Sequence, residues 1–157
     1  MCNSAPIPTV IFVCTGNTCR SPMAAAIAMS IFKAHGLAIT VLSAGVAAGD
    51  GYPASNNAIS AMLDEQCDLK PHCSTQISQE ILNNASLVLT MTDKHLRTVK
   101  AICPKANAYT LCEYAGEGSN ISDPFGGNLE IYRQCAAQIK QLILSSLVRL
   151  KEDLWKA

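Results

Sequence analysis

One short segment carries the residue types that can hold and attack a phosphoryl group. It spans residues 14–21 and reads CTGNTCRS. As a thiolate, Cys14 is a strong nucleophile, and the planar guanidinium of Arg20 can donate two parallel hydrogen bonds to phosphoryl oxygens. A cysteine and an arginine at this spacing also occur by chance, as a buried thiol and a surface cation. The flanking residues must therefore distinguish a phosphate-binding site from a chance pairing.

The flanking residues place the segment between a strand and a helix. Residues 9–13 (TVIFV) are apolar and rich in β-branched side chains, which predicts a buried strand. Ser21 and Pro22 are typical of a helix start, with Ser21 as the cap and Pro22 as the first helical residue, ahead of a helix over 23–33. The sequence therefore predicts a loop at the N-terminus of a helix.

A loop in this position can bind a phosphate group without net charge. Its backbone N–H groups point to one place, and the helix dipole adds a positive field that also stabilises the Cys14 thiolate. Gly16 and Asn17 tolerate the left-handed backbone conformation that such a loop needs. The Ser21 hydroxyl can bond to the thiolate. We therefore expect a phosphate-binding loop made of Thr15, Gly16, Asn17, Thr18, Cys19, Arg20 and Ser21.

The rest of the chain supplies the elements that must position this loop. We expect further strands over 38–43, 87–92 and 108–111, helices over 55–66, 93–101 and 129–155, and a loop over 113–127. Alternating strands and helices predict a three-layer α/β fold, with a four-stranded parallel sheet between helices, in a single domain over 1–157. Ligands of such sheets bind at the carboxyl ends of the strands, where Cys14 falls.

Composition excludes several classes of partner and site. Lys plus Arg equals Asp plus Glu, at 12 each, so no basic field attracts nucleic acid. No apolar run is long enough to span a membrane, and the N-terminus lacks a basic signal-peptide region, so we expect a cytoplasmic protein with no membrane partner. The balanced charge and ordinary size fit a monomer. The eight cysteines form no C-x-x-C pair, which favours reduced thiols and argues against a metal site. A nucleotide-binding P-loop is excluded because no Gly-Lys pair occurs.

The motifs, in their order, resemble those of the low-molecular-weight protein tyrosine phosphatase family over roughly residues 10–144. They are IFVCTGNTCRSPMA at 11–24, SAG at 43–45, PHCST at 71–75, LVLTMTDKH at 87–95 and DPFGG at 123–127. The resemblance implies that Cys14 attacks phosphorus and forms a thiophosphate intermediate. It also implies that Asp123 protonates the leaving group and then activates water, while Arg20 and the loop amides stabilise the phosphoryl oxygens. Phosphorylated proteins would be the substrates, with no cofactor or metal.

The resemblance also assigns supporting roles. Asn17, Ser21, Ser43 and His72 would hold the loop by hydrogen bonds, and Cys19 would form a reversible disulfide with Cys14 as a redox partner. Each assignment has a plainer alternative. Asp123-Pro124 is also an ordinary turn dipeptide, His72 could be a surface histidine, Ser43 a strand-end hydroxyl and Cys19 a packed thiol. His35 and His95 show no role, and we expect both at the surface.

Two residues indicate which phosphorylated side chain the protein prefers as its substrate. Thr18 stands where tyrosine-specific members usually carry isoleucine, and Phe125 is a lone aromatic residue where eukaryotic tyrosine-specific members usually carry two. Both features resemble the bacterial protein-arginine-phosphatase branch. A threonine hydroxyl can hydrogen-bond near a guanidinium or the attacking water, whereas isoleucine offers only apolar surface. We therefore predict substrate selectivity from Thr18 and Phe125, with phosphoarginine favoured and phosphotyrosine as the alternative.

Other classes of protein share the loop pattern. Arsenate reductases need a second redox pair of cysteines near the third strand, and residues 87–100 contain none; Cys67 and Cys73 lie earlier in the chain. Phosphocysteine domains of sugar transport systems lack the Arg-Ser ending of the loop and the remote Asp-Pro. A non-catalytic phosphate-binding module would not need Cys14, Arg20 and Asp123 together. The sequence therefore favours a phosphatase.

Overall fold

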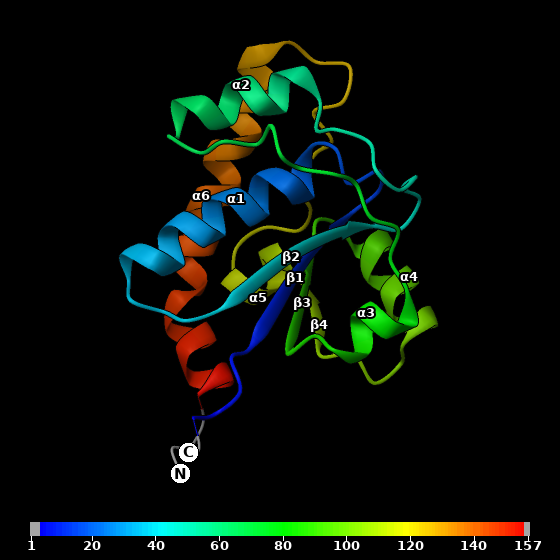
Figure 1. Ribbon diagram of the computed structural model, residues 1–157, viewed down its shortest axis with the longest axis vertical. Helices are drawn as coiled ribbons and strands as arrows, with labels where there is room; N and C mark the ends of the chain where they lie inside the picture. The colour runs from blue at the N-terminus through cyan, green and yellow to red at the C-terminus, as the bar shows by residue number, and fades with distance from the viewer. Residues whose placement is uncertain (1–3, 156–157) are drawn as a thin grey trace.

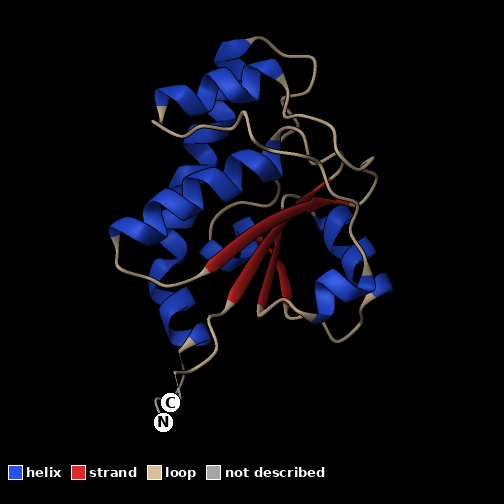
Figure 2. Ribbon diagram, viewed as in Figure 1, coloured by secondary structure: helices blue, strands red, loops and turns tan. Residues whose placement is uncertain are grey.

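The computed structural model describes residues 4–155 and places their strands in one parallel sheet. The strands are β1 (Thr9–Cys14), β2 (Thr40–Gly45), β3 (Leu87–Thr90) and β4 (Ala108–Thr110). Their order in space is β2-β1-β3-β4, and every pairing is parallel. Figure 2 shows the sheet between two sets of helices, which confirms the predicted α/β fold with a four-stranded parallel sheet.

Helices cover both faces of the sheet. They are α1 (Arg20–Ala34), α2 (Asn56–Asp64), α3 (Gln79–Asn83), α4 (Asp93–Ile102), α5 (Leu111–Ala115) and α6 (Leu129–Leu154). Figure 1 shows α1, α5 and α6 on one face of the sheet and α3 and α4 on the other, with α2 packed against α6. The chain therefore has the three layers that the alternation of strands and helices predicts.

The side chains of β1 alternate between two hydrophobic cores. Val10, Phe12 and Cys14 belong to the core beneath α1 and α6. Ile11 and Val13 belong to the core beneath α3 and α4. A strand buried on both faces has to be apolar at every position, which is why this stretch of sequence shows no polar alternation. The same alternation turns the Cys14 side chain towards the layer that contains α1.

The first helix begins earlier than the sequence suggests. It starts at Arg20, with Cys19 at the cap position and no side-chain bond to the helix N-terminus. The prediction that Ser21 caps the helix is therefore wrong, because the Ser21 hydroxyl is engaged by Asn17 and Cys14 instead. Pro22 lies at the third helical position, where a backbone N–H would have no partner within the helix.

Two short helices were not anticipated. Helix α5 occupies the start of the segment expected to be a loop over 113–127, and α3 precedes β3. Each has a side-chain cap, since Ser78 accepts from the Ile81 N–H and Thr110 accepts from the Glu113 N–H. Each is only five residues long, which is too short for a helical period to show in the sequence.

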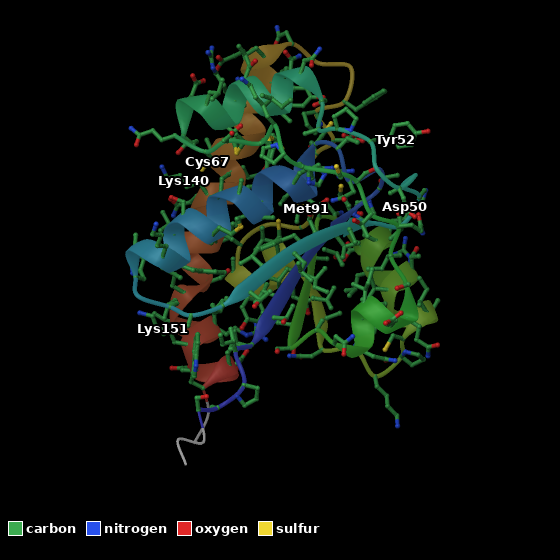
Figure 3. All side chains as sticks on the ribbon, viewed as in Figure 1. Asp50, Tyr52, Cys67, Met91, Lys140 and Lys151 are labelled. Carbon is green, nitrogen blue, oxygen red and sulfur yellow. The ribbon has the colours of Figure 1, made fainter. Side chains whose placement is uncertain are left out.

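The order of the strands opens a crevice where the chain reverses direction across the sheet. From β1 the chain passes through α1 to β2 on one side, and it later returns to β3 on the other side of β1. The loops after β1 and β3 therefore diverge, and ligands of such sheets bind between them. Met91, labelled near the middle of Figure 3, is fully buried at the end of β3. Its carbonyl accepts from the Ile121 N–H at 2.9 Å, which brings the segment before α6 to the crevice.

The described residues form neither a membrane-spanning helix nor a disulfide. Among residues 4–155, no helix combines the length and the apolar character that crossing a membrane requires. The seven cysteines of the same range are all free thiols, and Cys2 lies outside the described residues.

Candidate active site

Asn17 holds the loop after β1 in its shape. Its φ is 56°, in the left-handed region, and its side chain is fully buried. A residue with a Cβ adopts this conformation at a cost of about 1–2 kcal/mol, and asparagine is among the residues that adopt it most often. The left-handed turn expected at Gly16 and Asn17 therefore falls on the asparagine.

The Asn17 side chain and carbonyl use all their hydrogen-bonding groups within the site. Nδ2 donates to Ser21 Oγ at 2.7 Å and to Ser43 Oγ at 3.0 Å. Oδ1 accepts from the Thr75 N–H at 2.9 Å. His72 Nε2 lies 2.7 Å from the Asn17 carbonyl, and because a carbonyl only accepts, Nε2 carries the proton. The structure thus brings together Asn17, Ser21, Ser43 and His72, the residues expected to support the loop.

Cys14 ends β1 beneath this network. Its side chain is 3% exposed, and Sγ lies 2.9 Å from Ser21 Oγ. The Asn17 amide already fills one lone pair of that oxygen, so the Ser21 proton is free to be donated. The Ala44 carbonyl is the other acceptor within reach, at 3.4 Å. A thiolate at Cys14 would attract the proton more strongly because charged acceptors form the stronger hydrogen bonds.

Arg20 joins the loop to the segment that carries Asp123. The guanidinium is buried; Nη1 donates to the Ile121 carbonyl at 2.9 Å, and Nη2 lies 3.4 Å from Asp123 Oδ2. The Asp123 carboxylate is half exposed, and its Oδ1 accepts from the Phe125 N–H at 3.1 Å. Asp123 is therefore a turn residue and also a neighbour of Arg20, and its role as the acid stays a prediction.

These groups surround a cavity of about 240 Å³ at the carboxyl end of β1. Its lining residues are Cys14, Thr15, Gly16, Thr18, Cys19, Arg20, Asp123 and Phe125. Cys14 and Arg20 are buried at its floor, whereas Phe125 is 79% exposed at its mouth. The cavity therefore offers a nucleophile and a cation at depth, with a carboxylate nearer the entrance.

Cys19 points away from solvent into a small polar cluster. Its Sγ lies 3.2 Å from Tyr132 Oη, on α6, and 3.4 Å from Ser55 Oγ, which also caps α2. Burial, together with the hydrogen bond to Cys19, raises the pKa of Tyr132 to about 12, so the phenol keeps its proton and can donate to the sulfur. Sequence analysis did not identify Tyr132. The redox role of Cys19 stays a prediction.

His95 corrects an expectation. It was expected at the surface, yet only 3% of it is exposed, and its Nε2 lies 2.8 Å from Thr15 Oγ1. Burial, and next the positive charge of Arg20, lowers the pKa of His95 to about 4, so the imidazole is neutral at physiological pH. His35 is exposed, as expected. The position of His95 in the first turn after β3 was the signal that could have found it, because that turn faces the crevice.

No group of three or more His, Cys, Asp or Glu side chains within residues 4–155 is arranged to hold a metal ion. Arg20 and the loop amides are the groups beside the cavity that could balance the charge of a bound phosphoryl group.

Comparison with known proteins places the chain among phosphatases. Residues 9–156 match the family described as low molecular weight phosphotyrosine protein phosphatase. The protein-arginine-phosphatase of Bacillus subtilis is 38% identical over 147 residues, which cover 92% of this chain and 97% of that protein. The low molecular weight protein-tyrosine-phosphatase PtpB of Staphylococcus haemolyticus is also 38% identical, over 85% of this chain and 94% of that protein.

Solved structures agree in fold as well as sequence. An arginine phosphatase mutant with a phosphorylated active-site serine superimposes with a TM-score of 0.88 at 37% identity, covering 93% of this chain and 97% of that one. A low molecular weight protein tyrosine phosphatase from T. tengcongensis superimposes with a TM-score of 0.87 at 36% identity, covering 90% of this chain and 99% of that one.

Proposed function

The chain belongs to the low molecular weight phosphotyrosine protein phosphatase family, and from this premise we propose that it dephosphorylates proteins phosphorylated on arginine. As a member of the family it is a cysteine-dependent protein phosphatase. Identity to the arginine phosphatase and to the tyrosine phosphatase is equal, at 38%, so the choice rests on the residues of the cavity. The observation that carries the proposal is the Thr18 side chain, which lines the cavity together with Cys14 and Arg20.

In the first step, the Cys14 thiolate attacks phosphorus. The S–P bond forms and the P–N bond of phosphoarginine breaks, while the carboxylic acid of Asp123 gives its proton to the leaving nitrogen. Arg20 and the loop amides stabilise the phosphoryl oxygens as charge develops on them. In a related arginine phosphatase in which serine replaces a cysteine, the active-site serine is phosphorylated. That finding supports a covalent intermediate at the corresponding place in this chain.

In the second step, water attacks phosphorus and the S–P bond breaks. The Asp123 carboxylate takes a proton from the water, which restores its acid form and releases inorganic phosphate. The departing sulfur regains its negative charge, and the Ser21 hydroxyl 2.9 Å away can stabilise it by donating its proton. The same group thus assists the nucleophile before attack and the leaving thiolate after hydrolysis.

Two residues that line the cavity support the proposal of a guanidinium leaving group rather than a phenol. Thr18 presents a hydroxyl, whose oxygen can accept from an N–H of the leaving group or orient the attacking water. Phe125 is the one aromatic residue among those that line the cavity, so a phenol ring would stack on one side only. A phosphotyrosine phosphatase is the second candidate, and the exposed Phe125 ring is the observation in its favour.

The test is a paired rate comparison. The purified protein receives a phosphoarginine peptide and a phosphotyrosine peptide of matched sequence, and kcat/KM is measured for each. Thr18→Ile replaces the hydroxyl by apolar surface, and Cys14→Ser removes the nucleophile. We expect the wild type to prefer phosphoarginine, Thr18→Ile to lower the preference by about tenfold or more, since a hydrogen bond to a charged group is lost, and Cys14→Ser to be inactive on both peptides.

Two outcomes would overturn parts of the proposal. A preference for phosphotyrosine that Thr18→Ile leaves unchanged would return the enzyme to the tyrosine phosphatases, with the same nucleophile. Activity that persists in Cys14→Ser on either peptide would require a different nucleophile. Thermal unfolding of both variants serves as the control that the loop still folds.

A further inference from the structure

A hydrogen-bonded pair at the wall of the cavity is not used by the mechanism above. The Thr15 hydroxyl lies 2.8 Å from the Nε2 atom of His95, which stands in the first turn of α4. Thr15 comes from the loop after β1 and His95 from the helix that follows β3, eighty residues apart in sequence. The contact therefore exists only because the sheet places β1 beside β3.

Depth within the cavity indicates which part of a substrate Thr15 would meet. Cys14 and Arg20 are 3% and 5% exposed, and they form the floor that holds phosphorus. Thr15 is exposed to solvent and lines the same cavity, together with the half-exposed Asp123. Thr15 is therefore nearer to solvent than Cys14 and Arg20, where a leaving group would lie above the phosphoryl group.

The Thr15 oxygen has hydrogen-bonding capacity left after it pairs with His95. If Nε2 carries the imidazole proton, the oxygen accepts it with one lone pair and keeps the other. If Nδ1 carries the proton, Thr15 donates to Nε2 and keeps both lone pairs. In either tautomer at least one acceptor site remains on Thr15. The imidazole also fixes where that site points, because it selects the rotamer of a β-branched side chain.

Phosphoarginine and phosphotyrosine differ at this level. A guanidinium retains N–H groups that are not bonded to phosphorus, and these need acceptors when water is displaced. The phenol ring carries only C–H groups at its edge and gains nothing from a hydroxyl there. An acceptor in the wall therefore contributes to the binding of one leaving group and not of the other.

We propose that Thr15 is a specificity-determining residue whose hydroxyl oxygen accepts from a guanidinium N–H of phosphoarginine, and that His95 is the positioning residue that orients this hydroxyl. The inference rests on the proposed function, since it concerns how the same site selects phosphoarginine. It adds a second wall contact to that of Thr18, on the opposite side of Gly16 in the loop sequence.

The experiment measures kcat/KM on matched phosphoarginine and phosphotyrosine peptides for variants of both residues. Thr15→Val removes the hydroxyl and keeps the shape, and we expect it to lower kcat/KM for phosphoarginine about tenfold more than kcat/KM for phosphotyrosine. Thr15→Ser keeps the hydroxyl and should preserve the preference for phosphoarginine.

The positioning role of His95 is tested by its effect on the preference for phosphoarginine, which it is proposed to exert through Thr15. His95→Phe keeps a ring but removes the nitrogen that contacts Thr15. The ratio of kcat/KM for phosphoarginine to kcat/KM for phosphotyrosine should therefore fall, as it does in Thr15→Val. His95→Gln supplies an amide nitrogen at a similar reach and should recover most of the ratio. In the double variant of Thr15→Val with His95→Phe, the ratio should be no lower than in Thr15→Val alone, because both changes remove one interaction.

Phosphotyrosine turnover separates specificity from structural damage. Equal losses on both peptides, or an unchanged ratio in Thr15→Val, would overturn the inference and leave the proposed function intact. A wild type that prefers phosphotyrosine would overturn the proposed function, and this inference with it, before any variant is made. If His95→Phe does not fold, the pair Thr15→Val and Thr15→Ser still decides, because Thr15 is exposed.

Discussion

At the scale of single residues, two buried polar side chains near Cys14 differ in how many of their polar atoms have hydrogen-bond partners. Asn17 has a partner for each of its side-chain groups. His95 has one partner, Thr15, and its Nδ1 is buried without a hydrogen-bond partner among residues 4–155. A buried polar group left unpaired costs free energy, so a fold selected for stability alone would disfavour it. The cost is consistent with a task at the substrate cavity.

The lowered pKa of His95 also predicts how the free energy of unfolding depends on pH. Its pKa falls from 6.5 to about 4 in the folded protein, chiefly through burial and next through Arg20, with Lys94 adding to the effect and Asp123 opposing it. In the unfolded chain the imidazole becomes protonated as pH drops below 6.5, whereas in the folded protein it stays neutral until pH nears 4. Acid therefore favours the unfolded state, and the free energy of unfolding should fall by about 1–2 kcal/mol between pH 7.5 and pH 5.

Urea unfolding at both pH values measures this loss, and His95→Gln is the control. The variant lacks a group that titrates in this range, so its stability should change less with pH than that of the wild type. An identical pH dependence in the two proteins would show that other groups cause it.

At the scale of elements, the loop after β1 depends on one left-handed residue and on a close backbone contact. Gly45, the last residue of β2, has no side chain, and an added Cβ would lie 3.0 Å from the Asn17 nitrogen and within contact distance of the Thr15 carbonyl. The loop therefore packs directly on the β2 backbone, and SAG at 43–45 is needed for space as well as for the Ser43 hydroxyl. This explains why the motif accompanies the loop.

Replacing Asn17 separates backbone conformation from hydrogen bonding. Asn17→Gly keeps access to the left-handed region but loses the side-chain bonds, and Asn17→Ala loses both. We expect Asn17→Ala to be less stable than Asn17→Gly by about 1 kcal/mol, the cost of a left-handed alanine. Both variants should lose phosphatase activity because the Ser21 hydroxyl is no longer held. The measurement is urea unfolding, and a more stable alanine variant would contradict the account of Asn17.

At the scale of the whole molecule, the cavity is complete within one chain. Its floor and wall come from the loop after β1, whose Thr15 contacts the first turn of α4, and its mouth comes from the segment before α6. Large apolar side chains elsewhere on the molecule remain exposed, including Tyr52, which projects outward in Figure 3. All the residues that line the cavity come from one chain.

We predict that a single chain is active and that the protein is a monomer. We expect a mass near 16.7 kDa in solution and a specific activity that does not change as the protein is diluted. Light scattering after size exclusion measures the mass, and rates at serial dilutions measure the activity. A specific activity that falls on dilution would show that assembly contributes to the site.

The strand, the loop and the residue types of the chemistry could be predicted from the sequence, because these features depend on neighbours along the chain. CTGNTCRS after TVIFV predicted the loop at the end of β1, and DPFGG pointed to Asp123 through the resemblance. Helix boundaries were less certain, since Ser21 could serve as a cap or bond to Cys14, and only the fold decided between them.

The contacts between side chains far apart in the sequence depend on how the elements pack. His95 contacts Thr15 because parallel pairing of β1 and β3 brings the first turn of α4 beside the loop. Tyr132 reaches Cys19 because α6 packs against α1. Neither contact leaves a pattern in the sequence, since a hydrogen bond across the sheet depends on strand order and on the direction of a side chain. Local spacing predicts the elements, and their packing determines which groups line the cavity.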